Sequence, residues 1–291
     1  MRREELADAD CGIAQALGVL GDWWTFLLVR DIAGGTTRFD ALQRELGMSR
    51  RALTERLAGL VDHGVLEKKA YSAHPPRFDY LLTHRGEALL PTLIALQDWG
   101  VRHVMGDGAL TATGNDAEVR RVESLIGRRL PDLKIKDQDD RPVRPAEPGG
   151  WTVLFFFPGA FAPADTHAYP PGWGAIPGAP GCTLETRTYA DRHPAFAAAG
   201  VAVRGISTQR PDQLAAYSAW AGLPYPLLSD QDARLAAGLL LPTFRAAGVD
   251  RFKRLTLLTD PELTVRAVQF PVSDPAGSVD DMLERASRRT R

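Results

Sequence analysis

The spacing of apolar residues divides this chain into two parts with different secondary structure. From Ala7 to Met105, apolar residues recur at every third or fourth position, as in amphipathic helices, and the first of these helices is expected to stop at Gly34. TTRFDALQRELG and MSRRALTERLAGLVDHG follow as two more helices. Gly47 is suited to end the first of them, and Ser49 and Gly64 are suited to begin and end the second. Two helices joined by a tight glycine-containing turn indicate a helix-turn-helix.

After Gly64 the pattern changes to short runs rich in β-forming residues. VLEKKAY and RFDYLLT are separated by SAHPP, whose prolines cannot continue a helix, so we expect a hairpin, or wing. Thr83 then begins a long apolar-periodic helix that Pro91 is expected to kink, and a terminal helix of this kind suits dimerisation. The stretch GDGALTATGN that follows has the composition of a linker.

Beyond the linker, helices and strands alternate. A short helical run, EVRRVESLIG, precedes WTVLFFF and VAVRGIS, two apolar runs of strand length that are typical of strands covered on both faces. The helical TYADRHPAFAAAG lies between them, and PDQLAAYSAWAG, KRLTLLTD and TVRAVQFP supply another helix and two strands. This order predicts an α/β domain with a partly parallel sheet. We therefore expect a winged domain over residues 1–106, a linker and short helix over 107–127, and the α/β domain over 128–291.

Composition narrows the possible functions. The 291 residues are 44% hydrophobic and carry a formal net charge of -1, which argues against a uniformly basic surface that coats nucleic acid. The sequence has neither the apolar core of a signal peptide nor an apolar run of about 18 residues, so a soluble cytoplasmic protein without a membrane partner is expected. In that reducing compartment the two cysteines, Cys11 and Cys182, are expected to be thiols.

The stretch PGCTLE places Cys182 at the predicted start of a helix. Unpaired N–H groups and the positive end of the helix dipole stabilise a thiolate there, and Gly181 allows close approach of the backbone. Arg254 would add a cation if it opens a strand beside the one that carries Phe157. The simpler alternative is a small buried residue at a tight turn.

PGCTLE, with FFFPG before it and FAAAGVAVRGISTQ, LPYPLLSD and KRLTLL after it, resembles peroxiredoxins of the bacterioferritin-comigratory, AhpC/TSA type from residue 128 onward. The resemblance implies a thioredoxin-like fold and a thiol-dependent peroxidase. Cys182 would attack a hydroperoxide, Arg254 would polarise the peroxide, and Glu185 would orient the arginine, while Pro158 and Thr183 complete the site. The resulting sulfenic acid needs a thiol reductant, either a small thiol or a thioredoxin-like protein, and no metal or other cofactor is expected.

Two departures from that family pattern affect the interpretation. Ala179 stands where the family usually has threonine, so the hydroxyl of Thr166 or Thr183 is a candidate replacement. The long insert before Cys182 resembles a subgroup that carries the pattern GWGAIPGAPGCT. Arg187 stands where many relatives have a resolving cysteine, so resolution has to come from a small thiol, another protein, the other subunit, or Cys11.

The first hundred residues, from CGIAQALGVLGDWW through the hairpin to ALQDWG, resemble HxlR-type winged-helix transcription regulators, which are relatives of the MarR group. The resemblance implies a homodimer that binds a double-stranded DNA operator, with residues 49–63 as the recognition helix. Candidates for base or phosphate contacts on that helix, and for phosphate contacts around the wing, are Ser49, Arg50, Arg51, Thr54, Arg56, Lys68, Lys69 and Arg77. Alternatively these charges form a solvated helix face, which is plausible for Arg56 but not for the whole pattern.

Cys11 lies where several members of that family have an oxidant-sensing cysteine. The alternative is a small residue at a helix start, but the fused peroxidase-like domain favours the redox role. Three hypotheses follow for the whole chain. The first is a peroxide-responsive regulator in which oxidation of Cys182 is passed to the winged helix, through a disulfide with Cys11 in one version. The second is a one-cysteine peroxidase with an autoregulatory DNA-binding domain. The third is a plain regulator whose second domain is a degenerate peroxiredoxin fold, an option that Ala179 keeps open.

Overall fold

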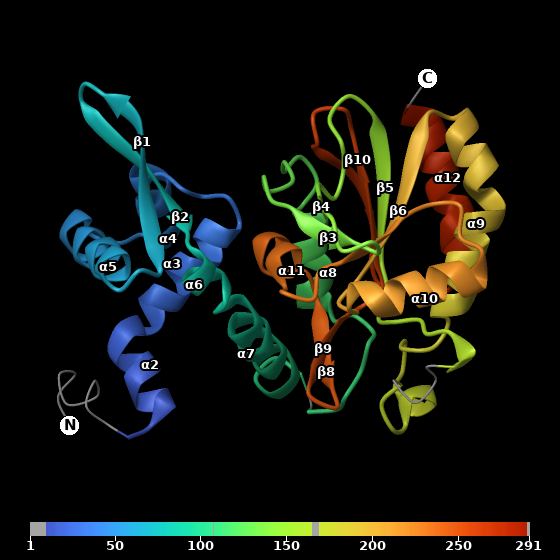
Figure 1. The fold of residues 1–291 in the computed structure, drawn as a ribbon, viewed down its shortest axis with the longest axis horizontal. Helices are drawn as coiled ribbons and strands as arrows, with labels where there is room; N and C mark the ends of the chain where they lie inside the picture. Colours follow the sequence, from blue (N-terminus) through green and yellow to red (C-terminus); the bar gives the residue numbers. More distant parts are fainter. Residues whose placement is uncertain (1–9, 107, 165–168, 290–291) are drawn as a thin grey trace. The chain divides into compact units, whose positions relative to one another are not determined.

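The computed structural model describes residues 10–106, 108–164 and 169–289 (Figure 1). Contacts within the chain divide it into two compact units between Leu93 and Ile94. The first unit has the winged helix-turn-helix architecture, and the second has the thioredoxin-like α/β architecture, as the sequence predicts. The linker expected from composition lies on the C-terminal side of this division.

The first unit consists of helices followed by a two-stranded antiparallel hairpin, and a further helix, α7, begins in it and continues into the second unit. Its core is built from apolar side chains that recur at every third or fourth position of the helices. They include Leu28, Ile32, Leu42, Leu53 and Leu57, each at most 4% exposed. The elements are α2 (Gly12–Leu20), α3 (Trp23–Ala33), α4 (Phe39–Leu46), α5 (Arg50–Asp62), β1 (Leu66–Ala73), β2 (Pro76–Leu82), α6 (His84–Glu87) and α7 (Leu90–His103).

Local signals in the sequence set most of these boundaries. Gly47 ends α4 in the left-handed region, and the Ser49 hydroxyl accepts a hydrogen bond from the Ala52 N–H at the start of α5, as predicted. Two predictions were wrong. The first helix is two helices, because the chain turns at Gly21 and the Asp22 side chain caps α3.

The helix expected after Thr83 is also two helices. Thr83 caps α6 by accepting a hydrogen bond from the Gly86 N–H, and that helix ends after a single turn. Pro91 then occupies the first turn of α7, a position that needs no N–H donor, so it starts a helix where we expected it to kink one.

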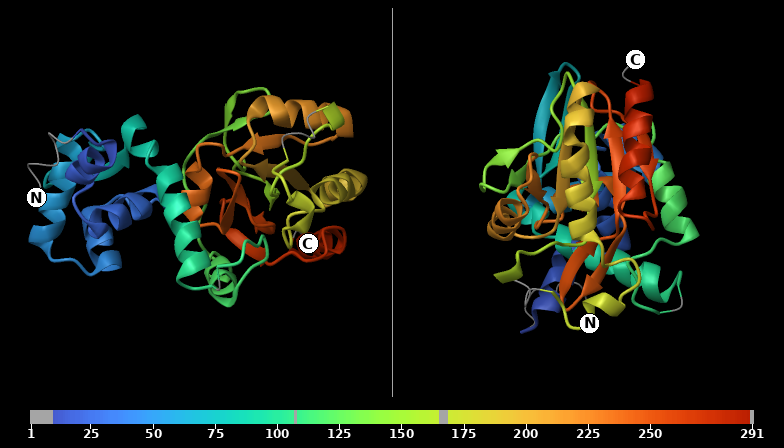
Figure 2. Two further views of the ribbon diagram at one scale, coloured as in Figure 1. Left: turned by 90° about the horizontal axis from the view of Figure 1, so that it is seen from below. Right: turned by 90° about the vertical axis from the view of Figure 1, so that its right-hand side faces the viewer.

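The second unit is built on a seven-stranded sheet of order β11-β10-β5-β6-β7-β3-β4 (Figures 1 and 2). Strands β5, β6 and β7 are parallel and the other pairs are antiparallel, so the predicted partly parallel sheet is confirmed. The strands are β3 (Ile135–Asp137), β4 (Pro142–Val143), β5 (Trp151–Phe156), β6 (Val201–Ser207), β7 (Leu227–Ser229), β10 (Leu255–Thr259) and β11 (Val265–Gln269), with a separate hairpin of β8 (Thr243–Ala246) and β9 (Val249–Phe252).

Helices pack on the sheet and bury its apolar side chains. In Figure 1, α9 (Cys182–Ala198) and α12 (Gly277–Arg289) lie side by side along the sheet, and Tyr189 and Met282 join Phe155 of β5 in one apolar core. Phe156, the next residue of β5, has its ring against Phe252 of β9. The remaining helices are α8 (Asp116–Glu123), the short 3-10 helix η2 (Trp173–Ala175), α10 (Pro211–Ala221) and α11 (Arg234–Leu239).

Most of α7 belongs to the second unit, although the helix begins in the first. The Gln97 side chain donates a hydrogen bond to the Leu241 carbonyl at 2.9 Å, and Asp98, which is 8% exposed, lies beside the Arg245 backbone. Leu241 lies just before strand β8, and Arg245 belongs to it. This end of α7 is therefore fastened to the β8–β9 hairpin.

Within the described residues, no single helix is both long and apolar enough to cross a membrane, and only the bent pair of α2 and α3 meets that length and composition together.

Candidate functional site

Cys182 is the first residue of α9, and its side chain is 4% exposed. Gly181 precedes it with φ of 106°, a conformation that L side chains rarely adopt, and a Cβ there would lie 2.8 Å from Pro275 Cγ. The Cys182 Sγ is 3.6 Å from the Ala179 carbonyl, to which a thiol can donate. Gly181 therefore helps to place the Cys182 sulfur at the helix N-terminus, and a side chain at position 181 would strain the backbone.

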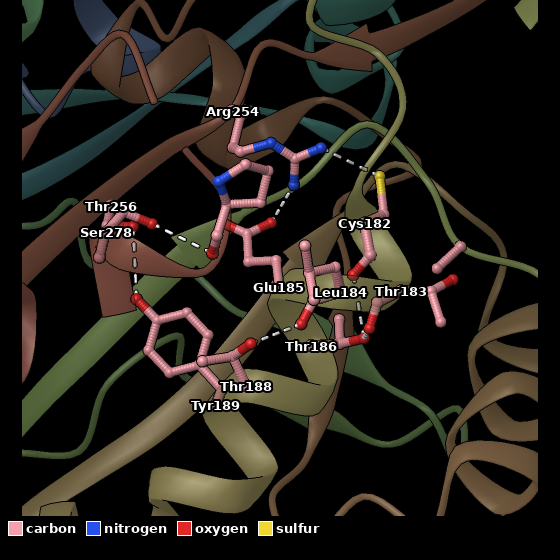
Figure 3. Close-up of polar contacts among 12 residues, drawn as sticks. Cys182, Thr183, Leu184, Glu185, Thr186, Thr188, Tyr189, Arg254, Thr256 and Ser278 are labelled. Carbon is pink, nitrogen blue, oxygen red and sulfur yellow. Dashed lines mark hydrogen bonds and ion pairs between the residues drawn. The ribbon is translucent and has the colours of Figure 1, made fainter. Parts of the chain in front are cut away.

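Arg254 reaches the cysteine from the neighbouring strand. It directly precedes β10, whose Leu255 pairs with Phe156 of β5, so it occupies the position that the sequence predicted. Its Nη2 donates to the Cys182 Sγ at 3.4 Å and to the Pro180 carbonyl at 3.1 Å, and its Nη1 pairs with the Glu185 carboxylate (Figure 3). Sulfur, guanidinium and carboxylate thus form one continuous chain of contacts.

This chain of contacts is buried. Arg254 is 2% exposed and Glu185 is fully buried one turn into α9. Burial raises the pKa of Glu185 to about 7, against the opposing charge of Arg254. Burial alone would lower the pKa of Arg254, but the negative charges of Glu185 and Cys182 outweigh it and raise that pKa. The guanidinium therefore stays charged throughout the pH range in which the protein can work.

Hydroxyl groups hold the first turn of α9 in place. The Thr186 Oγ1 donates to the Cys182 carbonyl at 3.0 Å and lies 2.5 Å from the Tyr217 hydroxyl of α10. Thr183, the candidate replacement for the missing threonine, lies near the Tyr217 hydroxyl. Thr166, the other candidate, lies outside the described residues. Ala179 is fully buried and offers its carbonyl to both Cys182 and Arg254.

Pro158 follows β5 and presents its carbonyl to a residue that the sequence did not single out, Arg251 of β9. The Arg251 Nη1 donates to this carbonyl at 3.2 Å, and Arg251 is 5% exposed. The buried Gln209 amide was also missed, and it both donates to and accepts from the Ala160 backbone at 2.8 Å. Neither contact could be predicted from the sequence, because each joins segments that lie far apart in the chain.

Arg187 lies on the exposed side of α9, with its guanidinium 5.1 Å from the centre of the Trp220 ring. It is engaged with an aromatic face, at the position where many relatives carry a second thiol. Cys11, the other cysteine, is exposed at the start of α2 and makes no capping hydrogen bond with its side chain. Among the residues that the structure describes, no group of three or more His, Cys, Asp or Glu side chains could hold a metal ion.

In the first unit, arginines gather around a cavity of about 550 Å³ between α4, the start of α5 and the hairpin. Arg50 and Arg77, two of the predicted DNA contacts, line it together with Arg38, Arg44 and Tyr71. Arg50 pairs with Asp40 at 3.3 Å, whereas Arg44 and Arg77 form no ion pair with any described residue. The place of Arg38 and Arg44 in this cluster could not be predicted from the sequence, because only the fold brings them beside the wing.

The other candidate DNA contacts differ in their exposure and in their contacts within the protein. Arg51 and Thr54 are exposed on α5, and Arg51 pairs with Glu55 at 2.8 Å. Lys68 and Lys69 are exposed on β1. Arg56 is different, because it is partly buried and pairs with Asp22, the cap of α3. The structure thus gives Arg56 a contact within the protein, which is neither the DNA contact nor the solvated helix face considered for it.

Comparison with known proteins follows the division seen in the fold. Residues 19–107 match the HxlR-like helix-turn-helix family, and residues 175–268 match the AhpC/TSA family. An uncharacterised HTH-type transcriptional regulator of Mycobacterium tuberculosis is 38% identical over 88 residues, which are 30% of this chain and 56% of that protein. This chain therefore spans little more than half the length of that mycobacterial relative.

Two further relatives are covered more completely. An uncharacterised regulator of Methanothermobacter thermautotrophicus is 32% identical over 31% of this chain and 70% of its own length. The regulator YvaP of Bacillus subtilis is also 32% identical, over 31% of this chain and 84% of its own length.

Solved structures align with the second unit. Peroxidoxin BcpB of Mycobacterium tuberculosis is 26% identical with a TM-score of 0.46, and the alignment covers 57% of this chain and 97% of that one. The bacterioferritin comigratory protein of Xanthomonas campestris is 24% identical with a TM-score of 0.45, over 55% of this chain and 93% of that one. On the two family matches and the regulators of Methanothermobacter thermautotrophicus and Bacillus subtilis, the chain belongs to the HxlR-like helix-turn-helix family of transcription regulators and carries, fused behind that region, a peroxiredoxin-like region of the AhpC/TSA family.

Proposed function

We propose that this chain is a peroxide-responsive DNA-binding regulator whose sensor is Cys182. The observation that carries the proposal is the contact of Arg254 with the Cys182 sulfur at 3.4 Å, at the N-terminus of α9 and backed by buried Glu185. A guanidinium and a helix N-terminus both favour the thiolate, which is the nucleophilic form of cysteine. The same guanidinium can polarise a bound hydroperoxide.

The proposed reaction is a displacement at oxygen. The Cys182 thiolate attacks the terminal oxygen of the hydroperoxide, an S–O bond forms as the O–O bond breaks, and the alkoxide or hydroxide leaves and takes a proton from solvent. The sulfenic acid is then attacked by a thiol, which releases water and leaves a disulfide. Because Arg187 occupies the usual position of a second cysteine, that thiol comes from an external reductant in a reducing cytoplasm or from Cys11.

A contact network supports passage of the signal out of the site. The Ala112 N–H, in the segment after α7, donates to the Pro177 carbonyl at 2.8 Å in the loop that leads to Cys182. Gly178 approaches the same segment so closely that a Cβ would lie 3.0 Å from the Ala112 carbonyl carbon. Ala112 also shares an apolar cluster with Ala179.

An oxygen atom added to a sulfur that is only 4% exposed needs space. We expect the loop before α9 to move to provide it, and the segment bonded to that loop to move as well. This segment continues α7, so the displacement would reach the helix that begins in the DNA-binding unit. The DNA contacts would come from the arginines of the cavity beside the wing, as phosphate ligands, and from the exposed face of α5.

The test combines oxidation and DNA affinity on the same sample. The reduced full-length protein is titrated with one equivalent of hydrogen peroxide or tert-butyl hydroperoxide. Adducts on the two cysteine peptides are mapped by mass spectrometry, and affinity is measured for DNA obtained by in vitro selection on the reduced protein. We expect Cys182 to oxidise first and affinity to change with it. A Cys182 that stays reduced at micromolar peroxide would refute the proposal, and a response that survives in Cys182→Ser would move the sensor to Cys11.

A second candidate function is a one-cysteine peroxidase whose DNA-binding unit regulates its own synthesis. The exposed Arg187 favours it, because a site without an internal resolving thiol leaves Cys182 to an external reductant. Sustained peroxide consumption with an added thiol, together with unchanged DNA affinity upon oxidation, would select this function over the sensor.

A further inference from the structure

Two residues, Lys253 and Arg254, join the β8–β9 hairpin to the main sheet. β9 ends just before them and β10 begins just after them, and these two strands belong to different sheets. On the hairpin side, the Lys253 N–H donates to the Pro242 carbonyl at 2.9 Å. The position of this joint sets the point from which the Arg254 side chain reaches the Cys182 sulfur.

The Lys253 side chain is buried and bound to a carboxylate from a distant part of the chain. Its Nζ donates to the Glu118 Oε2 at 2.9 Å, and the side chains of Lys253 and Glu118 are 4% and 1% exposed. Glu118 lies on α8, 135 residues earlier in the chain. The two neighbouring residues of the joint therefore extend to different helices, Arg254 to α9 and Lys253 to α8.

Glu118 is itself held in place by the start of α8. Its Oε2 also accepts from the Asn115 N–H at 3.0 Å, and its own N–H donates to the Asn115 Oδ1 at 2.9 Å, which makes a capping box. Just after α8, the Gly127 N–H donates to the carbonyl of Val265 in β11 at 2.8 Å. Lys253 is thus bound to a carboxylate whose position both ends of α8 define.

A buried ion pair of this kind adds little stability. Taking both charges out of water costs about as much as their attraction returns, and apolar side chains of similar size are often at least as stable. The pair does define a position, because a buried ammonium has to stay within reach of its carboxylate. The contribution of Lys253 and Glu118 is therefore the location of the joint that carries Arg254.

We propose that Lys253 and Glu118 are positioning residues for Arg254. Their ion pair fixes the joint between the hairpin and β10, and so holds the guanidinium against the Cys182 sulfur. The inference rests on the proposed function only in taking Arg254 as the cation that acts on this sulfur. It gives α8 a part in the cysteine site, although α8 lies outside residues 175–268, which match the AhpC/TSA family.

The test follows the alkylation of Cys182 by iodoacetamide at pH 7 in the full chain. The thiolate displaces iodide, and mass spectrometry reads the Cys182 peptide, with the peptide of exposed Cys11 as internal reference. We expect Lys253→Met to slow Cys182 about three- to tenfold, because a displaced guanidinium no longer donates fully to the sulfur. Lys253→Arg keeps the ion pair and should retain most of the rate. Lys136→Met removes an exposed, ion-paired lysine and should react as the unmodified chain does.

A double variant separates positioning from stability, and it keeps the inference testable if Lys253→Met alone does not fold. Lys253→Met leaves the Glu118 carboxylate buried and unpaired, whereas Lys253→Met with Glu118→Gln has no unpaired charge and should regain stability in urea titrations. The glutamine still offers an acceptor to the Asn115 N–H. We expect the double variant to alkylate slowly despite its recovered stability. Recovery of both stability and rate, or a Cys182 rate in Lys253→Met that is unchanged or faster, would overturn the inference.

Peroxide oxidation of the same samples distinguishes this inference from the proposed function. A Cys182 that resists micromolar peroxide, but whose alkylation depends on Lys253 and Glu118, would refute the proposed function and leave the inference standing. A Cys182 that peroxide oxidises, but whose alkylation is the same in all variants, would do the reverse.

Discussion

Replacing Gly181 with alanine tests how strictly the backbone before α9 controls Cys182. Gly181 has φ of 106°, and a residue with a side chain costs about 1–3 kcal/mol in such a conformation. The new Cβ would also lie 2.8 Å from Pro275 Cγ, so either the loop of Pro275 or the start of α9 has to shift, at a cost of about 1–3 kcal/mol. Together these predict a loss of about 2–6 kcal/mol from the stability of the second unit.

That loss is large against a typical stability of about 5–15 kcal/mol, but it leaves the unit folded, with a melting temperature lower by about 10 °C. Because the helix start that has to shift carries Cys182, we expect the contact of Arg254 with Cys182 to weaken. Alkylation of Cys182 by iodoacetamide should slow accordingly. Hydrogen exchange of β5 and α9 peptides, read by mass spectrometry, measures the stability of this unit apart from the first.

Gly174→Ala is the matched control. Gly174 lies in the same insert, has no positive φ, and would place its Cβ in open space with no atom within 4 Å. We expect its stability to stay within about 0.5 kcal/mol of the unmodified chain. If Gly181→Ala and Gly174→Ala agreed in both exchange and alkylation, the strain assigned to Gly181 would not exist, and the placement of Cys182 would need another explanation.

Three further predictions concern charged groups. Arg254→Met and Glu185→Gln should each destabilise the second unit by about 3–5 kcal/mol, while the double variant costs clearly less than their sum in a double-mutant cycle, since each single change leaves a buried partner unpaired. Burial raises the pKa of Asp230 from 3.8 to about 7, so the folded state binds its proton more tightly and stability should fall as pH rises between about 4 and 7. Asp230→Asn should lessen that slope by about 1.4 kcal/mol per pH unit in urea titrations at several pH values, and an unchanged slope would contradict the assignment. Arg44→Ala should weaken DNA binding and reduce the slope of log affinity against log salt by about one, whereas Arg85→Ala, on α6 outside the cavity, should leave the slope unchanged.

Local signals explain why much of this fold is predictable from the sequence. Ser49 at the start of α5, Gly47 at the end of α4 and the continuous apolar run of β5 each act through their own neighbours, and each stands where expected. The helix-start cysteine and Arg254 were also predictable, because strand pairing brings the start of β10 beside the end of β5.

The missed features depend on contacts between distant segments. Arg251 lies in the short stretch VDRF, where a charged residue is expected to face solvent, and the loop after β5 and the insert around Trp173 bury it. The hairpin of β8 and β9 has a weak signal in the sequence, the alternation in TFRA before the turn at Gly248. The break at Gly21 was missed because apolar spacing continues through it.

The course of α7 has a practical consequence. A protein cut after residue 106, the boundary that composition predicts, would keep Gln97 and Asp98 on the DNA-binding fragment and take them from the Leu241 carbonyl and the Arg245 backbone. The isolated peroxiredoxin-like fragment should therefore begin near Leu90, so that it keeps the part of α7 that contacts the β8–β9 hairpin. The same helix means that the two units cannot be separated at one residue without taking side chains from one of them, because α7 begins in the first unit and makes its hydrogen bond in the second.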